Sequence, residues 1–410
     1  MLKRNMLLAI LVGLNLRPSM AVIGPLAHRI QQDISASFSQ IALLTSLPVL
    51  AMGLGCFITL RLTRYWDMSK MVAMSLLLIA LADALRLQVS TNHGLLLTAL
   101  TAGVGIACIQ VLLPILIKQQ HRHQAPLVMG WYVAAIMAGA AVSAATASWL
   151  TTQLGHWQAS LAFWGLLALF AWGVWQKRWA ALSQTGCTQS HPTEDQKSIE
   201  DHNSRAIPKP SRPLTKQARP WLLALFFGLG TSGYTCVLAW LPPYFVSLGF
   251  SEAQAGFTLG YLTAVEVIAG LALPTLASYR LDRRRIMLPT LIAGALGFVL
   301  LAYTPLSFTW ISLTLLGIGI GGIFPLSLIV CMDHHADPKT AGAITGLAQG
   351  IGYMMAATAP WLAGIIRDQL DQWTYSWIAL AILYGVMMLI ALRFNPQHYA
   401  RHITPPPQAA

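Results

Sequence analysis

The chain consists of long apolar runs separated by short stretches of charged or turn-forming residues. The segments 71–81, 95–117 and 286–301 contain no Asp, Glu, Lys or Arg. A helix needs about 20 apolar residues to cross a hydrocarbon core about 30 Å thick. Only helices and closed barrels satisfy every backbone hydrogen bond in lipid, and these runs lack the alternation of barrel strands. The pattern therefore predicts an all-α integral membrane protein.

Twelve such spans can be delimited, six before and six after a polar gap. They lie near 5–26, 41–60, 71–90, 94–117, 127–151, 159–176, 221–243, 254–277, 286–304, 309–331, 340–364 and 374–393. The gap is rich in Ser, Thr, Pro, His and mixed charge, a composition typical of poorly ordered linkers. We therefore expect a six-helix half at 1–176, a disordered cytoplasmic linker at 177–219, a second six-helix half at 220–395 and a cytoplasmic tail at 396–410.

The two halves share sequence features at a nearly constant spacing. Gly103-Val-Gly105 in the fourth span matches Gly317-Ile-Gly319 in the tenth, an offset of 214. The fifth and eleventh spans match at an offset of 212, and the basic loops after the second and eighth spans at 219. With six spans each, both halves enter the membrane in the same sense. The sequence predicts two parallel six-helix repeats around a central cavity.

Charge distribution orients these spans. Only 10% of residues are charged, against about a quarter in soluble proteins, and the net charge is +12. With the N-terminus inside, all but four of the 26 Lys and Arg fall on the inner side; the exceptions are Arg17, Arg29, Arg86 and Arg367. This bias follows the positive-inside rule. We expect a bacterial inner-membrane protein with both termini cytoplasmic, and no nucleic-acid partner.

The architecture resembles the major facilitator superfamily, which also has two six-helix halves and a central linker. The superfamily has a basic loop motif, D-R-x-G-R-R. The second copy here reads Tyr-Arg-Leu-Asp-Arg-Arg over 279–284, and the first lies around residues 64–67. The resemblance implies a gating role for the charged residues of both copies: Arg64, Asp67, Arg280, Asp282, Arg283 and Arg284.

Three segments resemble one subgroup of that superfamily, the cyanate permease and nitroimidazole transporter group. They are Asn15-Leu-Arg17-Pro18 with Gly24-Pro25, Gln110-Val-Leu-Leu-Pro114 followed by Lys118, and Gly346-Leu-Ala-Gln349-Gly350-Ile-Gly352-Tyr353. The resemblance covers about residues 5–393 without the linker. It implies a secondary transporter, with a substrate that the sequence does not specify.

Arg17 is the most informative single residue. A rise of about 1.5 Å per residue places it about 18 Å into the first span, near the bilayer midplane. A charge there costs at least about 2.5–3.5 kcal/mol, so it should face a cavity or a partner. Its planar donor fork favours binding of an anionic or electron-rich substrate, and the alternative is a structural salt bridge. Pro18 removes a backbone donor and is expected to loosen the helix.

Glu266 lies at a similar depth in the eighth span. Two interpretations remain open. A buried carboxylate readily takes up a proton and suits a proton carrier. Alternatively, Glu266 is the counter-ion of Arg17 and joins the halves in one state of a transport cycle. The two interpretations are compatible if protonation breaks the pair.

Other intramembrane and loop charges have simpler interpretations. Asp83 is a second candidate for proton coupling, but it lies three residues before Arg86 on one helix face, which favours a local ion pair. Arg367, Asp368 and Asp371 near the last outer loop are expected to be ordinary solvated charges.

Six polar or aromatic residues on the expected cavity-lining spans are further candidates for substrate binding. Each is also suited to hydrogen bonding or packing between helices. They are Gln110, Tyr132, Tyr234, Phe324, Gln349 and Tyr353.

Together these features predict a proton-coupled secondary transporter of a small, anionic or polar solute that works by alternating access. An exporter of drugs or toxic compounds with the same fold is one alternative, and a non-transporting membrane sensor is another. No Walker A, HExxH or GxSxG sequence occurs, so we expect neither ATP-driven transport nor an enzyme. Five scattered cysteines indicate no metal site. The expected partners are a small-molecule substrate, protons and the lipid bilayer, with no cofactor, and the expected state is a monomer.

Overall fold

The computed structural model describes residues 2–89, 91–120, 125–185, 213–279, 282–335 and 337–399, and these contain helices but no strand. The helices, with short 3-10 turns labelled η, are α1 (Leu2–Leu14), α2 (Pro18–Ala21), α3 (Ile23–Ile34), α4 (Phe38–Leu62), α5 (Met68–Leu85), η1 (Arg86–Gln88), α6 (Asn92–Gln120), α7 (Ala125–Leu154), α8 (Trp157–Thr185), η2 (Leu214–Lys216), α10 (Ala218–Ser247), α11 (Glu252–Ser278), α12 (Arg284–Tyr303), α13 (Thr309–Asp333), α14 (Pro338–Leu370), α15 (Thr374–Leu392) and η3 (Pro396–His398).

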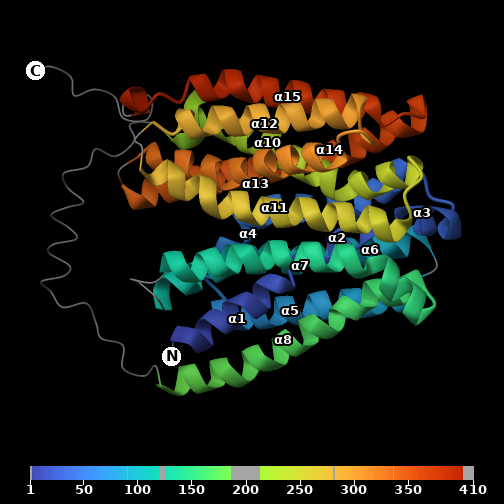
Figure 1. The fold of residues 1–410 in the computed structure, drawn as a ribbon. Helices are drawn as coiled ribbons and strands as arrows, with labels where there is room; N and C mark the ends of the chain where they lie inside the picture. The colour runs from blue at the N-terminus through green and yellow to red at the C-terminus, as the bar shows by residue number, and fades with distance from the viewer. Residues whose placement is uncertain are drawn as a thin grey trace, which may run out of the picture.

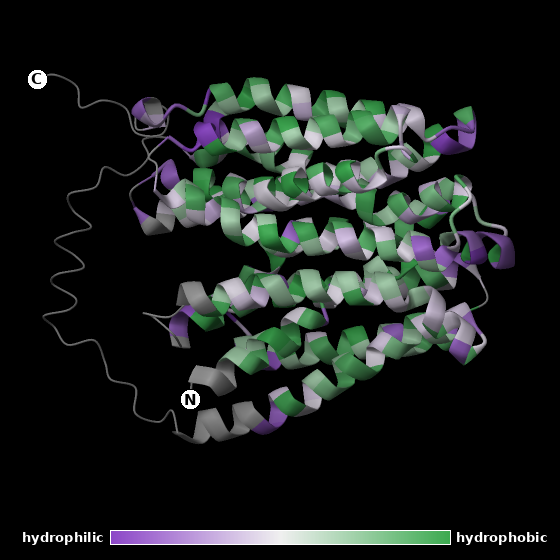
Figure 2. Cartoon of the chain, in the orientation of Figure 1, coloured by the Kyte–Doolittle hydropathy of each residue, from purple (hydrophilic) through white to green (hydrophobic). Residues whose placement is uncertain are grey.

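The part of the chain that the structure describes contains twelve membrane-length helical units, as the apolar runs predict. Within the described residues, eleven are long and apolar enough to cross a membrane, with α1, α2 and α3 counted as one span from Met6 to Ile34. The twelfth is α14, whose interior includes polar residues such as Thr345 and Gln349. Apolar residues cover the sides of the bundle and polar residues concentrate at its two ends (Figure 2). Large apolar side chains such as Leu97 and Leu389 are about two-thirds exposed on those sides, as expected for a surface that contacts lipid.

The helices run side by side, and α1 begins and α15 ends at the same end of the bundle (Figure 1). Helices α10 to α15 occupy the upper part of that view, and α1, α5, α7 and α8 the lower part. The end opposite the termini, where α3 ends and α11 begins, is called the far end below. An even number of spans in each half places the start of both halves at the same end.

The internal repeat is confirmed by how glycines pack the helices of each half. In the first half α6 packs on α4 and α5, because a Cβ at Gly103 would lie 2.5 Å from Pro48 and one at Gly105 would lie 2.7 Å from the Ser75 carbonyl. In the second half Gly317 and Gly319 of α13 pack on α11 and α12 in the same way. Small residues permit this close approach of membrane helices.

The two halves contact each other through two equivalent helix pairs. Helix α4 packs on α14, where a Cβ at Gly53 would lie 2.8 Å from the Gly350 carbonyl. Helix α7 packs on α11, where a Cβ at Gly256 would lie 2.7 Å from the Ala144 carbonyl. Each pair therefore joins the second span of one half to the fifth span of the other.

The boundaries of two elements differ from those predicted. The first span continues to Ile34 rather than ending near 26, because α3 extends it toward the far end. Helix α8 continues to Thr185, nine residues into the predicted linker. Residues 186–212 of the linker and 400–410 of the tail lie outside the described residues.

We expect Gly105→Ala and Gly319→Ala each to destabilise the bundle by about 1–3 kcal/mol, the usual cost of overpacking. The added Cβ would meet backbone atoms, at 2.7 Å for Gly105 and 2.4 Å for Gly319. Thermal unfolding of the detergent-purified protein measures the loss. Gly385→Ala is the matched control, since a Cβ there has nothing within 4 Å. An unchanged melting temperature for both test variants would contradict the packing argument.

Candidate functional site

The first span is interrupted near its middle. Helix α1 ends at Leu14 and α2 begins at Pro18, so residues 15–17 leave the helical path. Pro18 has no backbone N–H to donate, and the Asn15 side-chain amide donates to the Leu11 carbonyl at 2.7 Å, which caps the end of α1. The break expected at Pro18 is present. It places Arg17 on irregular backbone, a state tolerated in membranes where the backbone is enclosed by protein.

Arg17 is buried without a carboxylate partner. Only 4% of the residue is exposed, and no ion pair in the described chain includes it. Its Nη1 lies 3.9 Å from the sulfur of Met20 and 3.9 Å from that of Met52. The guanidinium carbon lies 5.2 Å from the centre of the Tyr234 ring. Thioethers accept hydrogen bonds weakly and Nε has no hydrogen-bond partner, so most of the donor fork stays available.

Glu266 of α11 is also buried and unpaired. It is 3% exposed, and neither carboxylate oxygen has a hydrogen-bond partner. It interacts electrostatically with Arg17, although no ion pair joins the two side chains. Gly321 of α13 packs on its backbone, since a Cβ there would lie 2.4 Å from the Glu266 carbonyl oxygen. Buried polar groups almost always have partners, so two unpaired ionisable groups beside one cavity make it the candidate functional centre.

A cavity between the two halves brings these groups together. Its volume open to the centres of water-sized molecules is about 50 Å³. A single water needs about 10–15 Å³ on this measure, so the cavity has room for a solute of a few heavy atoms. Apart from the two ionisable groups its walls are mostly apolar. The lining residues are Arg17, Val133, Ala134, Met137, Gly230, Thr231, Tyr234, Glu266, Val267, Gly270, Leu271, Ile320, Gly321, Phe324 and Pro325.

Three predicted residues lie close to this cavity without lining it. Gln110 of α6 donates to the Tyr353 hydroxyl of α14 at 2.9 Å, a bond between the two halves. The charge of Arg17 acts on both Tyr353 and Tyr132. Tyr132 is 2% exposed and its hydroxyl has no partner. Gln349 is not among the lining residues. The sequence did not single out Met20, Met52 or Thr231, because such residues are common in any apolar span.

Asp83 lies in an ion pair rather than at the cavity. Its Oδ1 is 3.0 Å from Nη1 of Arg86, and each side chain is 1% exposed. The Ser19 hydroxyl of α2 donates to both Asp83 carboxylate oxygens, at 3.0 and 2.8 Å. The local pair favoured by the spacing is present, but it is buried and reaches the interrupted first span.

The residues of the two basic loop motifs lie at the end of the bundle that carries the termini. Asp67 caps α5 by accepting from the amides of Ser69 and Lys70, at 3.0 Å each. Arg64 is exposed, and Arg280 lies outside the described residues.

In the second motif, Asp282 bonds to Arg284 at 2.8 and 2.9 Å, and Arg284 lowers the pKa of the Asp282 carboxyl. Arg283 forms an ion pair of 2.8 Å with Asp333 of α13. These contacts connect elements of the second half to one another.

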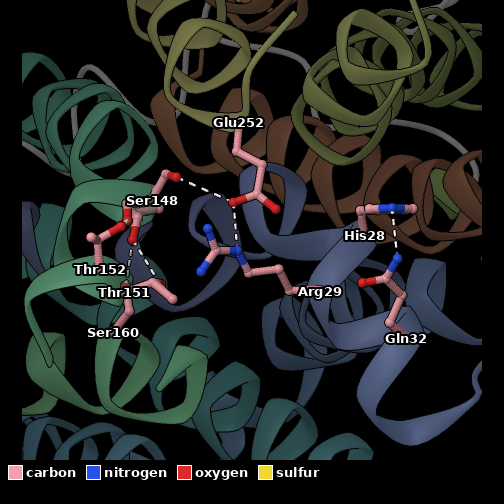
Figure 3. A network of polar contacts seen from close by, with 9 residues as sticks. His28, Arg29, Gln32, Ser148, Thr151, Thr152, Ser160 and Glu252 are labelled. Carbon is pink, nitrogen blue, oxygen red and sulfur yellow. Dashed lines mark hydrogen bonds and ion pairs between the residues drawn. The ribbon is translucent and has the colours of Figure 1, made fainter. Parts of the chain in front are cut away.

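Polar contacts join the two halves at the far end. Arg29 of α3 forms an ion pair of 2.6 Å with Glu252, the first residue of α11. The Ser148 hydroxyl of α7 donates to the same Glu252 oxygen at 3.2 Å (Figure 3). Asp368 of α14 accepts from the backbone amides of Phe38 and Ser39 at the start of α4, at 3.0 Å each. These contacts hold the two halves together at the far end.

Asp368 is exposed, as expected for a solvated charge, but it also accepts these hydrogen bonds from the other half. An acid at a helix C-terminus shows no sequence signal for capping the N-terminus of a helix in the other half. Beside it, the Arg367 guanidinium lies 5.3 Å from the Phe38 ring centre and 5.6 Å from that of Trp373. Arg367 also pairs with Asp371.

Comparison with known proteins identifies the family of this chain. A family model described as Major Facilitator Superfamily matches residues 9–360. The chain belongs to that superfamily. It is 34% identical to the cyanate transport protein CynX of Escherichia coli K12, over 96% of this chain and 98% of that one. It is 30% identical to the 2-nitroimidazole transporter of the same organism, over 93% of each chain.

Solved structures agree with the fold. The D-xylose–proton symporter superposes with a TM-score of 0.75 at 13% identity, covering 96% of this chain and 97% of the other. The expected membership of the cyanate and nitroimidazole transporter group is confirmed. The chain is thus a multi-pass membrane transporter of small molecules, not an enzyme.

We expect the double substitution Glu252→Gln and Asp368→Asn to open the far end in part of the population. It removes one ion pair and replaces the charged helix cap with a neutral side chain. Spin labels at 153 and 253, both exposed and on opposite halves, should report a longer component in electron–electron resonance distances, in a background without the native cysteines.

The matched control is His28→Ala, which removes a bond to Gln32 within α3 only (Figure 3). This control should leave the distance distribution unchanged. An unchanged distribution in the double variant would mean that apolar packing alone holds the far end closed.

Proposed function

We propose that this protein moves a small anion, or a compact polar solute, across the bacterial inner membrane by alternating access, with protons as the coupling ion. The observation that carries the proposal is the pair of buried, unpaired groups at one cavity between the halves. Arg17 offers unused donors and Glu266 offers two unused carboxylate oxygens. An isolated buried charge is costly, so each group needs a partner at some stage of the cycle.

Protonation of Glu266 links the anion to the proton. With Glu266 neutral, Arg17 is the only charge at the cavity wall and an anion neutralises it. With Glu266 ionised, the carboxylate competes with the anion for the same guanidinium. Anion and proton therefore bind best together, which favours symport. The limited cavity volume and the relationship to a cyanate transport protein favour a solute of a few atoms.

The distribution of Lys and Arg indicates which end of the bundle faces the cytoplasm. The Lys and Arg distribution supports a cytoplasmic location for both termini, with the far end toward the periplasm. The contacts of Glu252 and Asp368 would then form a periplasmic gate between the two halves. Breaking them while the cytoplasmic end closes would expose the cavity to the other side. Both halves of one chain contribute to the lining of the cavity, which supports a monomer as the working unit.

Flux into proteoliposomes tests the proposal. Purified protein is reconstituted and labelled cyanate is supplied outside, with and without an imposed inward proton gradient. The proposal predicts net cyanate uptake that the gradient increases, and the same screen is run with labelled 2-nitroimidazole. Gradient-driven efflux of 2-nitroimidazole from preloaded proteoliposomes, without anion uptake, would favour an exporter. Binding of either compound without net movement would favour a sensor.

Arg17→Lys keeps the charge but loses the planar fork. Charge-assisted hydrogen bonds contribute about 1.5–3 kcal/mol, so we expect KM for the transported anion to rise about tenfold or more. Initial rates of uptake measure the change. Arg393→Lys, at an exposed position, is the control and should transport normally. An unchanged KM in Arg17→Lys would exclude bidentate binding of the anion.

Glu266→Gln removes the titratable group with little change in shape. We expect uptake to lose its stimulation by the proton gradient, while exchange of internal for external anion continues. Asp371→Asn is the control, because it changes an acid whose side chain is 93% exposed. Uptake by this variant should still be stimulated by the proton gradient. If Glu266→Gln still depends fully on the proton gradient, another group carries the proton.

A further inference from the structure

The Asp83–Arg86 pair is connected to the first span through Ser19. Besides the two bonds from the Ser19 hydroxyl to Asp83, Nη1 of Arg86 donates to the Ser19 carbonyl oxygen at 3.1 Å. Nε of Arg86 lies 3.4 Å from the Thr98 hydroxyl of α6. The hydroxyl and the backbone carbonyl of Ser19 are thus held from α5 and η1, and the same guanidinium reaches α6.

Ser19 lies in the short helical segment that follows the break in the first span. That segment is α2, four residues between the break at 15–17 and the turn residue Val22, and the amides of Met20 and Ala21 bond back to the Arg17 carbonyl. The Val22 amide reaches back to the carbonyls of Pro18 and Met20. So short a helix is not stable alone, and backbone groups freed at a break inside a membrane need partners from neighbouring helices.

Stability alone does not account for this ion pair. Desolvation of two charges cancels much of their attraction, and a buried pair can often be replaced by apolar residues without loss of stability. Neither Asp83 nor Arg86 lines the cavity. The pair does supply hydrogen-bond donors and acceptors to Ser19, which lies two positions after Arg17.

We propose that Asp83 and Arg86 are positioning residues that hold α2 so that the Arg17 side chain is presented to the cavity. The inference rests on the proposed role of Arg17 in binding the anion. Arg86 suits the task because its fork contacts Asp83, Ser19 and Thr98 at once, which the single ammonium of a lysine does not reproduce.

The test separates positioning from simple stabilisation. The double substitution Asp83→Leu and Arg86→Met replaces the pair by apolar side chains of similar size. It should melt within a few degrees of the wild type, yet hydrogen exchange of the amides in 15–22 should become about tenfold faster, as expected for the loss of charge-assisted bonds. Ser19→Ala should accelerate exchange in the same segment by a smaller factor.

Ser143→Ala is the matched control. It also removes a buried hydroxyl from the first half, but that hydroxyl bonds only to the Ala140 carbonyl within α7. Exchange in 15–22 should not change. Initial rates of labelled cyanate uptake should show KM raised about tenfold in the double variant, with the maximal rate retained within about twofold, because loss of position weakens binding of the anion.

The location of the faster hydrogen exchange tests the positioning role. If faster exchange in the variants is confined to α5 and η1, the pair is only a local structural element and the inference is overturned. If the double variant does not fold, Ser19→Ala and Arg86→Lys provide the same readout. Failure of the wild type to move cyanate would count against the proposed substrate, whereas an altered 15–22 segment would still support the positioning role.

Discussion

A charge removed from water without a counter-charge is the constraint on which this structure depends. Arg17 can be buried between two thioethers and an aromatic ring only because the surrounding helices are fixed by other contacts. Those helices approach closely through glycines, and the interrupted backbone beside Arg17 is supported from α5. A continuous helix with a salt bridge in place of Arg17 would need neither the close glycine contacts nor the supported break in the first span. The candidate site is therefore distributed over both halves, although among the described lining residues only Arg17 and Glu266 are an acid or a base that can carry charge near neutral pH.

The fold was largely predictable because lipid restricts the possible structures. With no water to satisfy the backbone, an apolar run of sufficient length must be a helix, and the Lys and Arg bias indicates its direction. The repeat was predictable because Gly103 and Gly317 have the same packing role in their halves, and packing of that kind requires glycine. The depth of Arg17 and Glu266 followed from the rise of a helix, which is nearly constant.

The contacts that depend on neighbouring helices were not predictable. Nothing in the sequence indicates that Asp368 caps a helix more than 300 residues away, or that Ser19 lies beside Asp83. Such pairs are set by the rotation of each helix about its axis, which the nearly uniform apolar composition of the spans leaves undetermined. Met52 was missed for the same reason. Its chemistry is ordinary for a membrane helix, and only its distance from Arg17 distinguishes it.

The contacts at the far end are unequal in the signs of charge that each half contributes. The first half supplies Arg29 and the positive N-terminus of α4, and the second half supplies the acids Glu252 and Asp368. The second half also contributes the cation Arg367, whose guanidinium lies over the Phe38 ring of the first half. Ions screen exposed charges over about 8–10 Å at ordinary salt concentrations. In the proposed cycle, the stability of the far-end contacts would therefore depend on the ionic strength on the side that the far end faces.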